Sequence, residues 1–530
     1  MIYQGLVPYI FGTLGAYVIY KIVKLFLDEW TSPLRVLPGP PTASFIFGNA
    51  KIINETEAIH EKWIEQYGPT ITYRMFLGSS RLYTIDPKAL NHMMMNYYIY
   101  QRPEAARSGL RKILGNGVLV VEEDKHKQQR RIMNPAFGAA QIRELTEVFI
   151  EKSIELRDAW TSEISQPEAN GDVEVLSWLS KMTLDVIGQA GFNYRFDALA
   201  GKTSELSEAF STIFESATSL SLFAIARYLI PALRILPDPK AQTIKASRET
   251  MDRIGNELLS ESKADISSQK TSWTRRDLLS LLLRANVSTD LPPSQRMSDE
   301  DVLAQVPTFL VAGHETTSTA TTWALFALSQ NLQAQAKLRG ELLSVGTDNP
   351  TMDELNALPY LDAVVRETLR VYPPVEGPSR VAVQDDFLPF SKPIMGRNGK
   401  MVNGIWIKKG QSIILPIKTI NRDKSIWGED AKEFRPDRWE KIPEGAASIP
   451  GIWGNLMTFI GGPRACIGYR FSLVEMKALL FTLVRAFEFE LAVPAGDIGT
   501  KSFLVQRPFL KSNPKAGNQM PLILKPVNLA

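Results

Sequence analysis

Cysteine is almost absent from this chain: Cys466 is the only one among 530 residues. A single cysteine cannot form an intramolecular disulfide. It also cannot build the usual cysteine-rich structural zinc site, which needs about four Cys and His ligands. A lone cysteine can still be a packed core residue, a nucleophile or the axial ligand of a haem iron. The residues around Cys466 must decide between these three roles.

The chain also lacks a strong excess of charge of either sign. Its formal net charge is +3, and it has no basic run that could serve as a DNA-binding arm, so no nucleic-acid partner is expected. After residue 41 there is no repeat and no long Gly/Ser-rich or Pro-rich linker. The sequence therefore predicts one large globular domain over residues 42–530.

Charged side chains are missing from the first 20 positions. As a helix this segment would be about 30 Å long, which is the thickness of the hydrocarbon core of a bilayer. Lys21, Lys24 and Arg35 follow it, so the positive-inside rule predicts a single-pass anchor over residues 1–27 with the body of the protein in the cytosol. A cleaved signal peptide is the competing interpretation, but its basic start and cleavage site are not clear. Residues 28–41 form a linker that ends in the stiff segment Leu-Pro-Gly-Pro-Pro, a proline-rich hinge.

The rest of the chain combines long helical patterns with a few strand patterns. Residues 71–85 predict a β-hairpin, and strand patterns return at residues 380–416 and near the C-terminus. Residues 261–274, which are polar and contain four serines, predict an exposed loop. Residues 298–330 predict one long helix that begins at a capping box of Ser298 and Asp301 and bends at Pro307. These patterns together predict a mainly α protein with small β-sheets.

The surroundings of Cys466 favour the role of haem ligand. Cys466 lies in the segment Phe459-Ile460-Gly461-Gly462-Pro463-Arg464-Ala465-Cys466-Ile467-Gly468. An apolar helical pattern follows, so a thiolate would lie near a helix N-terminus, where negative charge is favoured. The segment resembles the haem-binding loop of the cytochrome P-450 family, Phe-x-x-Gly-x-Arg-x-Cys-x-Gly, at every fixed position. The resemblance implies the cytochrome P-450 fold, haem b (iron protoporphyrin IX) as the cofactor, Cys466 as the axial iron ligand and Arg464 as a partner of a haem propionate.

A second motif of this family lies in the middle of the long predicted helix. The residues Ala312-Gly313-His314-Glu315-Thr316 match the family's oxygen-activation motif, Ala/Gly-Gly-x-Asp/Glu-Thr. By resemblance, the hydroxyl of Thr316 forms a hydrogen bond during oxygen activation and Glu315 helps to relay protons. Taken alone, the motif could be a kinked helix with a back-bonded threonine. Helical spacing turns His314 about 100° away from either neighbour, so we expect a packed or hydrogen-bonded histidine rather than a ligand.

Glu367-Thr368-Leu369-Arg370, just before a Pro-Pro stop, matches the family's Glu-x-x-Arg motif. An acid and an arginine at i and i+3 share one helical face and can pair. The third member of the family's network would be Arg438. We expect a buried Glu/Arg/Arg network with a structural role beneath the haem loop.

Three more residues resemble ligands of the haem propionates. His126 and Arg130, at i and i+4 on one predicted helical face, occupy the family's Trp-x-x-x-Arg pattern with His in place of Trp. Arg130 is therefore expected to bind a propionate, and a contact of His126 with the haem stays open. Arg380 resembles another propionate ligand. A surface arginine is the alternative for both Arg130 and Arg380.

The resemblance runs from about residue 36 to the end and points to fungal microsomal members of the family. It implies a monooxygenase that inserts one oxygen atom from dioxygen into an apolar small molecule, with a terpenoid or other secondary metabolite as the expected substrate. Segments 97–118, 219–235, 305–311, 375–378 and 503–506 are the expected substrate contacts. The chain has no Gly-rich dinucleotide fingerprint after a strand and no fused flavin domain, so the electrons should come from another protein. By resemblance to membrane-anchored members of the family, the expected donor is NADPH-cytochrome P-450 reductase, at the endoplasmic reticulum.

Two alternatives stay open. One is an isomerase or dehydratase of the cytochrome P-450 type, whose members often lose the acid–Thr pair that is intact here. The other is a non-catalytic haem binder, which would not need Glu315 and Thr316 and usually fills both axial positions with His or Met.

Overall fold

The computed structural model describes residues 26–167, 170–202, 241–267, 277–287, 296–502 and 504–527. Some residues between 12 and 24, some between 204 and 212, and residue 292 are described as well. The chain divides into two compact units. Unit 1 comprises Met1–Pro103, Ser219–Pro239 and Gly377–Thr419, and unit 2 comprises Glu104–Thr218, Lys240–Glu376 and Ile420–Ala530.

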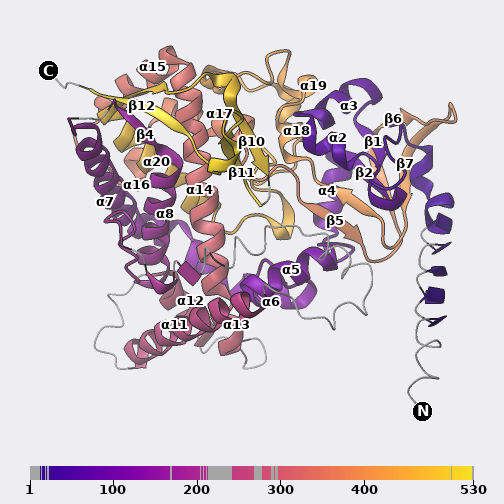
Figure 1. Cartoon of the computed structure of the whole chain (residues 1–530), viewed down its shortest axis with the longest axis horizontal. Coiled ribbons are helices and arrows are strands. Elements are labelled where there is room, and N and C mark those ends of the chain that lie inside the picture. Colours follow the sequence, from indigo (N-terminus) through magenta and orange to yellow (C-terminus); the bar gives the residue numbers. More distant parts are fainter. Residues whose placement is uncertain are drawn as a thin grey trace. The chain divides into compact units, whose positions relative to one another are not determined.

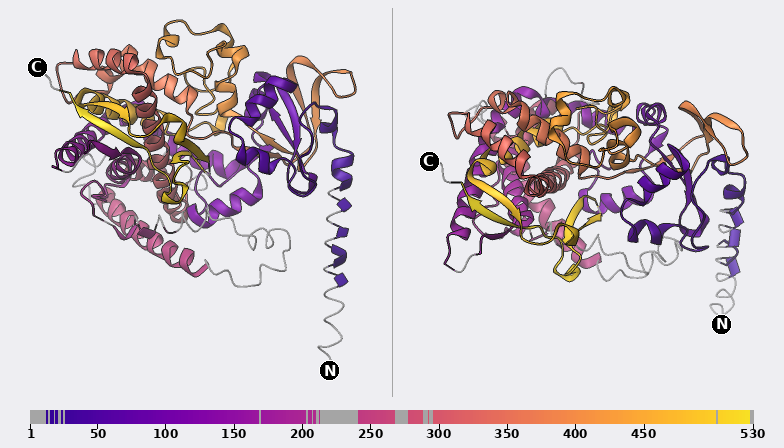
Figure 2. Two further views of the ribbon diagram at one scale, coloured as in Figure 1. Left: turned by 45° about the horizontal axis from the view of Figure 1, so that its top comes forward. Right: turned by 90° about the horizontal axis from the view of Figure 1, so that it is seen from above.

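Unit 1 is built around a five-stranded sheet of order β1-β2-β8-β5-β3. The pair β1–β2 is antiparallel and is the predicted hairpin, with Thr70 opposite Thr84. From far along the chain, β8 joins β2 in parallel, and β5 and β3 complete the sheet in antiparallel pairs. The strands of the unit, which include the separate ribbon β6–β7 beyond this sheet (Figures 1 and 2), are β1 (Thr70–Arg74), β2 (Ser80–Thr84), β3 (Tyr100–Gln101), β5 (Ser379–Ala382), β6 (Asp386–Met395), β7 (Met401–Ile407) and β8 (Ser412–Ile414).

The helices of unit 1 are short and come before and between these strands. They include η1 (Pro33–Val36), α2 (Ala50–Glu55), α3 (Ile59–Tyr67), η2 (Phe76–Gly78) and α4 (Pro87–Met95). The short helix α18 (Ile417–Asn421) crosses the boundary between the units.

Unit 2 is mainly helical. The helix α14 runs through its middle (Figure 1). Most of the residues of this helix are buried. The longer helices are α5 (Glu104–Leu114), α6 (Glu123–Met133), α7 (Ala139–Ile164), α8 (Val175–Phe192), α11 (Ala241–Ser267), α12 (Leu278–Val287), α14 (Gln305–Gln330), α15 (Leu332–Leu343), α17 (Pro359–Val371) and α20 (Tyr469–Ala486). The short ones are η3 (Asn134–Phe137), α13 (Asp299–Leu303), α16 (Met352–Asn356), α19 (Lys424–Trp427), η6 (Pro436–Glu440), η7 (Glu444–Ser448), η8 (Gly462–Arg464), η9 (Ala495–Asp497) and η10 (Pro514–Ala516).

Two small sheets complete unit 2. One is the three-stranded sheet β4-β12-β9 and the other is the antiparallel hairpin β10–β11. Their strands are β4 (Asp172–Glu174), β9 (Phe487–Leu491), β10 (Ile498–Ser502), β11 (Gln506–Leu510) and β12 (Pro521–Pro526). The predicted class, a mainly α protein with small sheets, is confirmed for the described residues.

The long helix predicted over residues 298–330 is divided into two. The predicted capping box is present, since Ser298 and Asp301 each bind the other's backbone amide. The first segment, α13, ends at Leu303, and α14 begins at Gln305. Pro307 has no N–H for the carbonyl four residues before it, and its ring clashes with that carbonyl. This carbonyl belongs to Leu303, so the proline interrupts the helical hydrogen bonds there, and Ala304, which keeps a right-handed helical conformation, joins the two segments.

The predicted loop over residues 261–274 is wrong in its first half, because α11 continues to Ser267. Serine and charged residues are only slightly unfavourable within a helix, and Leu258, Leu259 and Ser262 are buried on one side of this one. Tertiary packing therefore extends the helix beyond its apolar pattern. Residues 268–274 lie outside the described residues.

The expected membrane anchor over residues 1–27 falls largely outside the described residues. Residues 26–30 lie in a helix. Among the residues that can be described, none of the helices combines the length and the apolar character that a membrane span requires.

Candidate active site

Cys466 lies in a loop that is closed by its own backbone. The Cys466 amide donates to the Phe459 carbonyl at 2.9 Å, and the Ala465 amide donates to the Gly462 carbonyl at 3.0 Å. Gly462 has a φ of 68°, in the left-handed region that glycine enters without penalty. Ile460 has a φ of 57°, which costs a side-chain-bearing residue about 1–2 kcal/mol. Backbone strain of this kind is often found at functional sites.

The Cys466 thiol is exposed, yet protein atoms surround it densely enough that burial raises the pKa of this thiol. Both observations hold if the thiol faces an internal space rather than bulk solvent. A hydrogen bond from the Gly468 amide and the nearby charge of Arg130 act in the opposite direction and lower the pKa. The predicted position before a helix is confirmed, because α20 begins at Tyr469, directly after Gly468.

Arg130 and Arg464 lie close to the cysteine loop. Arg130 is on α6 and donates from Nη1 to the carbonyl of Ala465, while its Nε donates to Asn134 Oδ1 at 2.9 Å. Burial lowers the pKa of Arg130. Arg464 forms an ion pair with Glu122 and donates to the Val121 carbonyl at 2.9 Å. Val121 and Glu122, which directly precede α6, thus hold the Arg464 side chain in place.

His126 shares α6 with Arg130, one turn before it, as the sequence predicts. Its side chain is buried. Whether His126 contacts the haem stays a prediction.

Thr316 and Glu315 lie near the middle of α14. Ala312 is exposed and Thr316 is partly exposed, although their neighbours His314, Glu315 and the residues that follow are buried. One face of an otherwise buried helix is therefore left open at Ala312 and Thr316, which are one turn apart. The hydroxyl of Thr316 donates to the Ala312 carbonyl at 2.7 Å.

The glycine of the motif has a packing role. A Cβ at Gly313 would lie 2.9 Å from Cγ1 of Ile187 on α8, which is closer than side-chain atoms normally approach. Gly313 therefore lets α8 pack directly against the helix that carries Glu315 and Thr316.

The carboxylate of Glu315 has partners that the sequence did not reveal. Arg507 of β11 forms an ion pair with Oε2, and His314 Nε2 lies 3.1 Å from Oε1. His314 is buried and hydrogen-bonded, as predicted. No local pattern links Arg507 to α14, because the C-terminal hairpin approaches this helix only in the folded chain.

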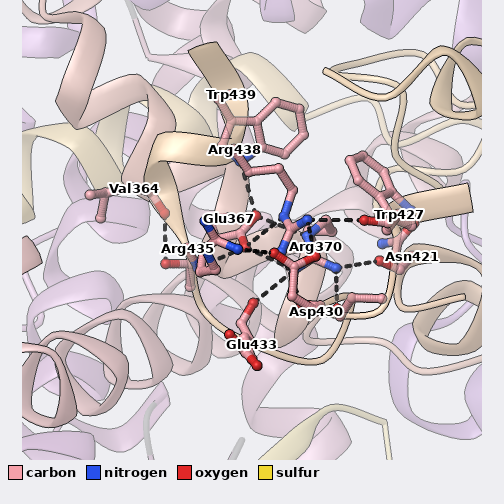
Figure 3. Close-up of polar contacts among 12 residues, drawn as sticks. Val364, Glu367, Arg370, Asn421, Trp427, Asp430, Glu433, Arg435, Arg438 and Trp439 are labelled. Carbon is pink, nitrogen blue, oxygen red and sulfur yellow. Dashed lines mark hydrogen bonds and ion pairs between the residues drawn. The ribbon is translucent and has the colours of Figure 1, made fainter. Parts of the chain in front are cut away.

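Glu367, Arg370 and Arg438 are brought together in the predicted network (Figure 3). Glu367 and Arg370 of α17 are fully buried and form two hydrogen bonds of 2.8 Å, from Nε and Nη2 of the arginine to the two carboxylate oxygens. Nε of Arg438 lies 3.4 Å from Glu367, and its Nη1 donates to Asp430 at 2.7 Å. Trp439 donates from Nε1 to Glu367 at 3.1 Å. The participation of Asp430 and Trp439 was not predicted.

Arg380 belongs to unit 1, on β5, and is buried. Burial and the neighbouring charge of Arg102 lower the pKa of Arg380 to about 9, and burial lowers the pKa of Arg102 to about 10. Two neighbouring cations, of which Arg380 is buried, favour the binding of an anion. This arrangement fits the expected contact with a propionate.

Of the expected substrate segments, residues 219–235 and Phe503 lie outside the described residues. Residues 305–311 form the first two turns of α14 and are buried. Within the described chain, no cluster of three or more His, Cys, Asp and Glu side chains could hold a metal ion. A haem iron bound through a single thiolate does not require such a cluster.

Comparison with known proteins gives a consistent result. A family model described as Cytochrome P450 matches residues 38–509. The chain is 53% identical to Cytochrome P450 monooxygenase 128 of Postia placenta, over 98% of each protein, and 53% identical to Cytochrome P450 monooxygenase 205 of the same fungus, over 96% of each. It is 38% identical to Cytochrome P450 monooxygenase claP of Ampulloclitocybe clavipes, over 88% of each. The range that the family model matches contains both the Cys466 loop and the Thr316 motif.

Proposed function

The chain belongs to the cytochrome P450 family and is a haem monooxygenase, and we propose that Cys466 is the residue that binds the haem iron. The observation that carries this proposal is the exposed thiol in a closed loop, with Arg130 and the amide of Gly468 beside it. When bound, the haem supplies the activation of dioxygen, from which one oxygen atom enters the substrate and the other leaves as water. As the iron ligand, the Cys466 thiolate would supply the electron density that favours this activation.

The haem propionates are proposed to meet a set of cations. Arg130 and Arg464 lie beside the cysteine loop, and Arg380 is buried near the charge of Arg102. Guanidinium groups bind carboxylates through paired hydrogen bonds, which suits this role. His126, one turn from Arg130, is the fourth proposed contact.

We propose that Thr316 and Glu315 deliver the protons of the reaction. Because the Thr316 hydroxyl donates its hydrogen to the Ala312 carbonyl, its oxygen is free to accept a hydrogen bond from the reacting side. Glu315 is buried one residue away and can hold a proton on its carboxylate. Both residues act on proton supply, and neither is needed to bind an apolar substrate.

Replacing Thr316 with alanine should therefore uncouple the reaction without preventing it from starting. Positioned proton transfer contributes about 10²–10⁴-fold to a rate, so product formed per NADPH oxidised should fall about tenfold or more while hydrogen peroxide rises. Folding, haem content and the substrate-induced spin shift should stay as in the unmodified protein. Thr316→Ser, which keeps the hydroxyl, is the matched control and should retain most of the coupling. Equal product per NADPH in Thr316→Ala and the unmodified protein would assign proton delivery to another route.

The proposed substrate is an apolar small molecule, with a terpenoid or another secondary metabolite as the first class to test. The proposal rests on the resemblance to fungal members and on the start of α14, which is buried and mainly apolar. Cells that co-express the chain with NADPH-cytochrome P-450 reductase should convert the right candidate into a product heavier by one oxygen atom. A product of unchanged mass, or one that has lost water without using dioxygen, would favour an isomerase or dehydratase. Ligand binding without any turnover would favour a haem binder.

We further propose that residues 1–27 anchor the protein in the membrane of the endoplasmic reticulum, that residues 28–41 are a hinge, and that residues 42–530 form the catalytic domain on the cytosolic side. The support is the absence of charge from positions 1–20 and the lysines that follow. Membrane lipid and the membrane-bound reductase are then the partners of this arrangement.

Removal of residues 1–27 is expected to release at least part of the protein from membranes, because the uncharged stretch at positions 1–20 is, as a helix, long enough to span a bilayer. Haem content should be unchanged, because all of the proposed haem contacts lie outside the deletion. The measurement is the distribution of haem absorbance between pellet and supernatant after membranes are sedimented. A full-length protein that is found in the supernatant, or is secreted with a trimmed N-terminus, would contradict the anchor.

A further inference from the structure

Glu315 lies between two charged or titratable partners from different parts of unit 2. Arg507, on the C-terminal hairpin, pairs with carboxylate oxygen Oε2, and Nε2 of His314 lies 3.1 Å from the other oxygen, Oε1. The side chains of Glu315 and His314 are 7% and 9% exposed, and that of Arg507 is 25% exposed. The arginine therefore forms the outer end of this cluster, while the acid and the imidazole are shielded from solvent.

The two contacts of His314 require one proton more than a neutral imidazole beside an ionised carboxylate would hold. Its Nδ1 lies 2.7 Å from the carbonyl oxygen of Leu310, which can only accept a hydrogen bond. Its Nε2 faces Oε1 of Glu315, which is also an acceptor when the carboxylate is ionised. A neutral imidazole has one N–H, so one of these two contacts would set lone pair against lone pair. Both contacts become favourable when a proton lies between Nε2 and Oε1.

That proton is better placed on Glu315 than on His314. Burial, together with the nearby charge of Arg507, lowers the pKa of His314 to about 4, so the imidazole is neutral at pH 7. The neutral imidazole donates from Nδ1 to Leu310 and accepts at Nε2. The carboxyl group of Glu315 then donates from Oε1, while its Oε2 stays in the ion-pair contact with Arg507.

We propose that His314 and Arg507 make Glu315 a proton store beside Thr316, in which His314 holds the carboxyl proton in place and Arg507 keeps that proton labile. The two partners have opposite effects: the imidazole stabilises the protonated acid, and the guanidinium charge favours the ionised one. Such a balance brings a buried acid toward the operating pH, where proton transfer is most effective. This inference rests on the proposed role of Glu315 and names the residues that control it.

The three side chains are held by packing from several elements. On α14, the His314 carbonyl accepts hydrogen bonds from Thr183 of α8 at 3.0 Å and from Ser318 at 2.7 Å. On the hairpin, the residue before Arg507 is fixed at both backbone groups, because the Gln506 amide donates to Pro374 at 2.8 Å and its carbonyl accepts from Trp323 at 2.8 Å. Lys501 of β10 lies opposite Arg507 in the hairpin register. Glu475, which is buried on α20, is a further titratable group and lies near α14 at Thr317.

The first test uses the pH dependence of coupling, measured as product per NADPH oxidised. Glu315 loses its carboxyl proton as the pH rises, so coupling should decline on the alkaline side in the unmodified protein. Arg507→Met removes the opposing charge and should move this decline upward by about 1–3 pH units. Arg507→Lys keeps the charge and should leave the decline close to its original position. His314→Leu removes the acceptor of the proton and should move the decline to lower pH. An unchanged profile in both Arg507→Met and His314→Leu would overturn the proposal.

The second test does not depend on turnover. In Glu315→Gln, the side-chain NH₂ can donate to His314 and the carbonyl can accept from Arg507, so this variant imitates the protonated acid. Its thermal unfolding temperature, followed on the resting haem protein, should stay close to that of the unmodified protein, while Glu315→Ala should unfold several degrees lower. Equal losses in Glu315→Gln and Glu315→Ala would show that the ionised carboxylate is the form present, and the proposal would be wrong. If no oxygenated product is ever found, the proposed function fails, but this comparison still decides whether the proton is stored.

Discussion

Replacing Arg370 with alanine is expected to prevent folded haem protein from accumulating. Arg370 is fully buried, and all five of its N–H donors have acceptors (Figure 3). Two donors bind the Glu367 carboxylate, and the other three bind the backbone carbonyls of Asn421, Ala431 and Glu433. Removing one partner of a buried ion pair costs about 3–5 kcal/mol. Because a folded domain is stable by only about 5–15 kcal/mol, this one change should remove a large share of the folding free energy.

The measurement is the yield of haem protein from cells, read from the absorbance of the reduced, carbon monoxide-bound form relative to total chain. Arg370→Lys tests whether the charge alone is sufficient. Lysine offers three donors from a single nitrogen and cannot reproduce the planar fork, so we expect it to restore little of the yield. This outcome would locate the effect in the geometry of the guanidinium group.

Arg435→Ala is the matched control from the same cluster. The side chain of Arg435 is 57% exposed and pairs with Asp430 at the rim of the network, while its backbone amide, which the substitution keeps, donates to Glu367 at 2.9 Å. Exposed ion pairs contribute about 0–1 kcal/mol, so this variant should accumulate almost normally. Normal haem content in Arg370→Ala would mean that the buried network does not support the fold.

The features that could be predicted from the sequence are those set by local chemistry. The β1–β2 hairpin, the capping box at Ser298 and the stop of α17 before its two prolines depend on residues that are near neighbours in the chain. The Cys466 loop is similar, because its glycine turn and the start of α20 lie within ten residues of one another. The physical cause of each of these features lies in neighbouring residues, so the sequence alone was sufficient to predict them.

The features that could not be predicted depend on packing between distant segments. Nothing near Glu315 indicates that Arg507 will pair with it, and nothing near Glu367 points to Trp439. The continuation of α11 to Ser267 is of the same kind, because burial of its inner side outweighs a polar sequence. The break before α14 is different, because its cause, Pro307, could be recognised in the sequence. The effect of Pro307 was assigned to its own position, although it acts on the carbonyl four residues earlier.

In unit 2, the side chains that stabilise the fold are different from those that we propose act in the reaction. The network of Glu367 and Arg370 fixes the chain from Asn421 to Glu433 through backbone carbonyls. Arg130 reaches the carbonyl that directly precedes Cys466, and α8 packs against α14 at Gly313. Changes to the network of Glu367 and Arg370 should affect the amount of folded protein. Changes at Cys466, Glu315 and Thr316 should affect its spectrum or its products while the fold persists.

Replacing Cys466 with serine is therefore expected to abolish the strongly red-shifted Soret band that a thiolate ligand gives in the reduced, carbon monoxide-bound state. Burial raises the pKa of the Cys466 thiol, and the Gly468 amide and Arg130 act against this rise. A coordinated metal ion removes the proton from a thiol outright, so the thiolate would persist in the haem protein. A serine hydroxyl is of similar size and can occupy the loop, but it does not supply the polarisable sulfur that donates electron density to iron.

Cys466→Ser should lose the red-shifted band completely, while the stability of its fold should change little. The loop is closed by backbone hydrogen bonds from the amides of Cys466 and Ala465, and serine retains both. The unfolding temperature of the apoprotein should thus differ little between Cys466→Ser and the unmodified chain, while monooxygenation is lost. Thr316→Ala is the matched control, because it changes α14 and leaves the thiolate in place, and it should keep the red-shifted band at full intensity. Since Cys466 is the only cysteine in the chain, no other residue can supply a thiolate, and a red-shifted band that survives in Cys466→Ser would refute the assignment of the iron ligand.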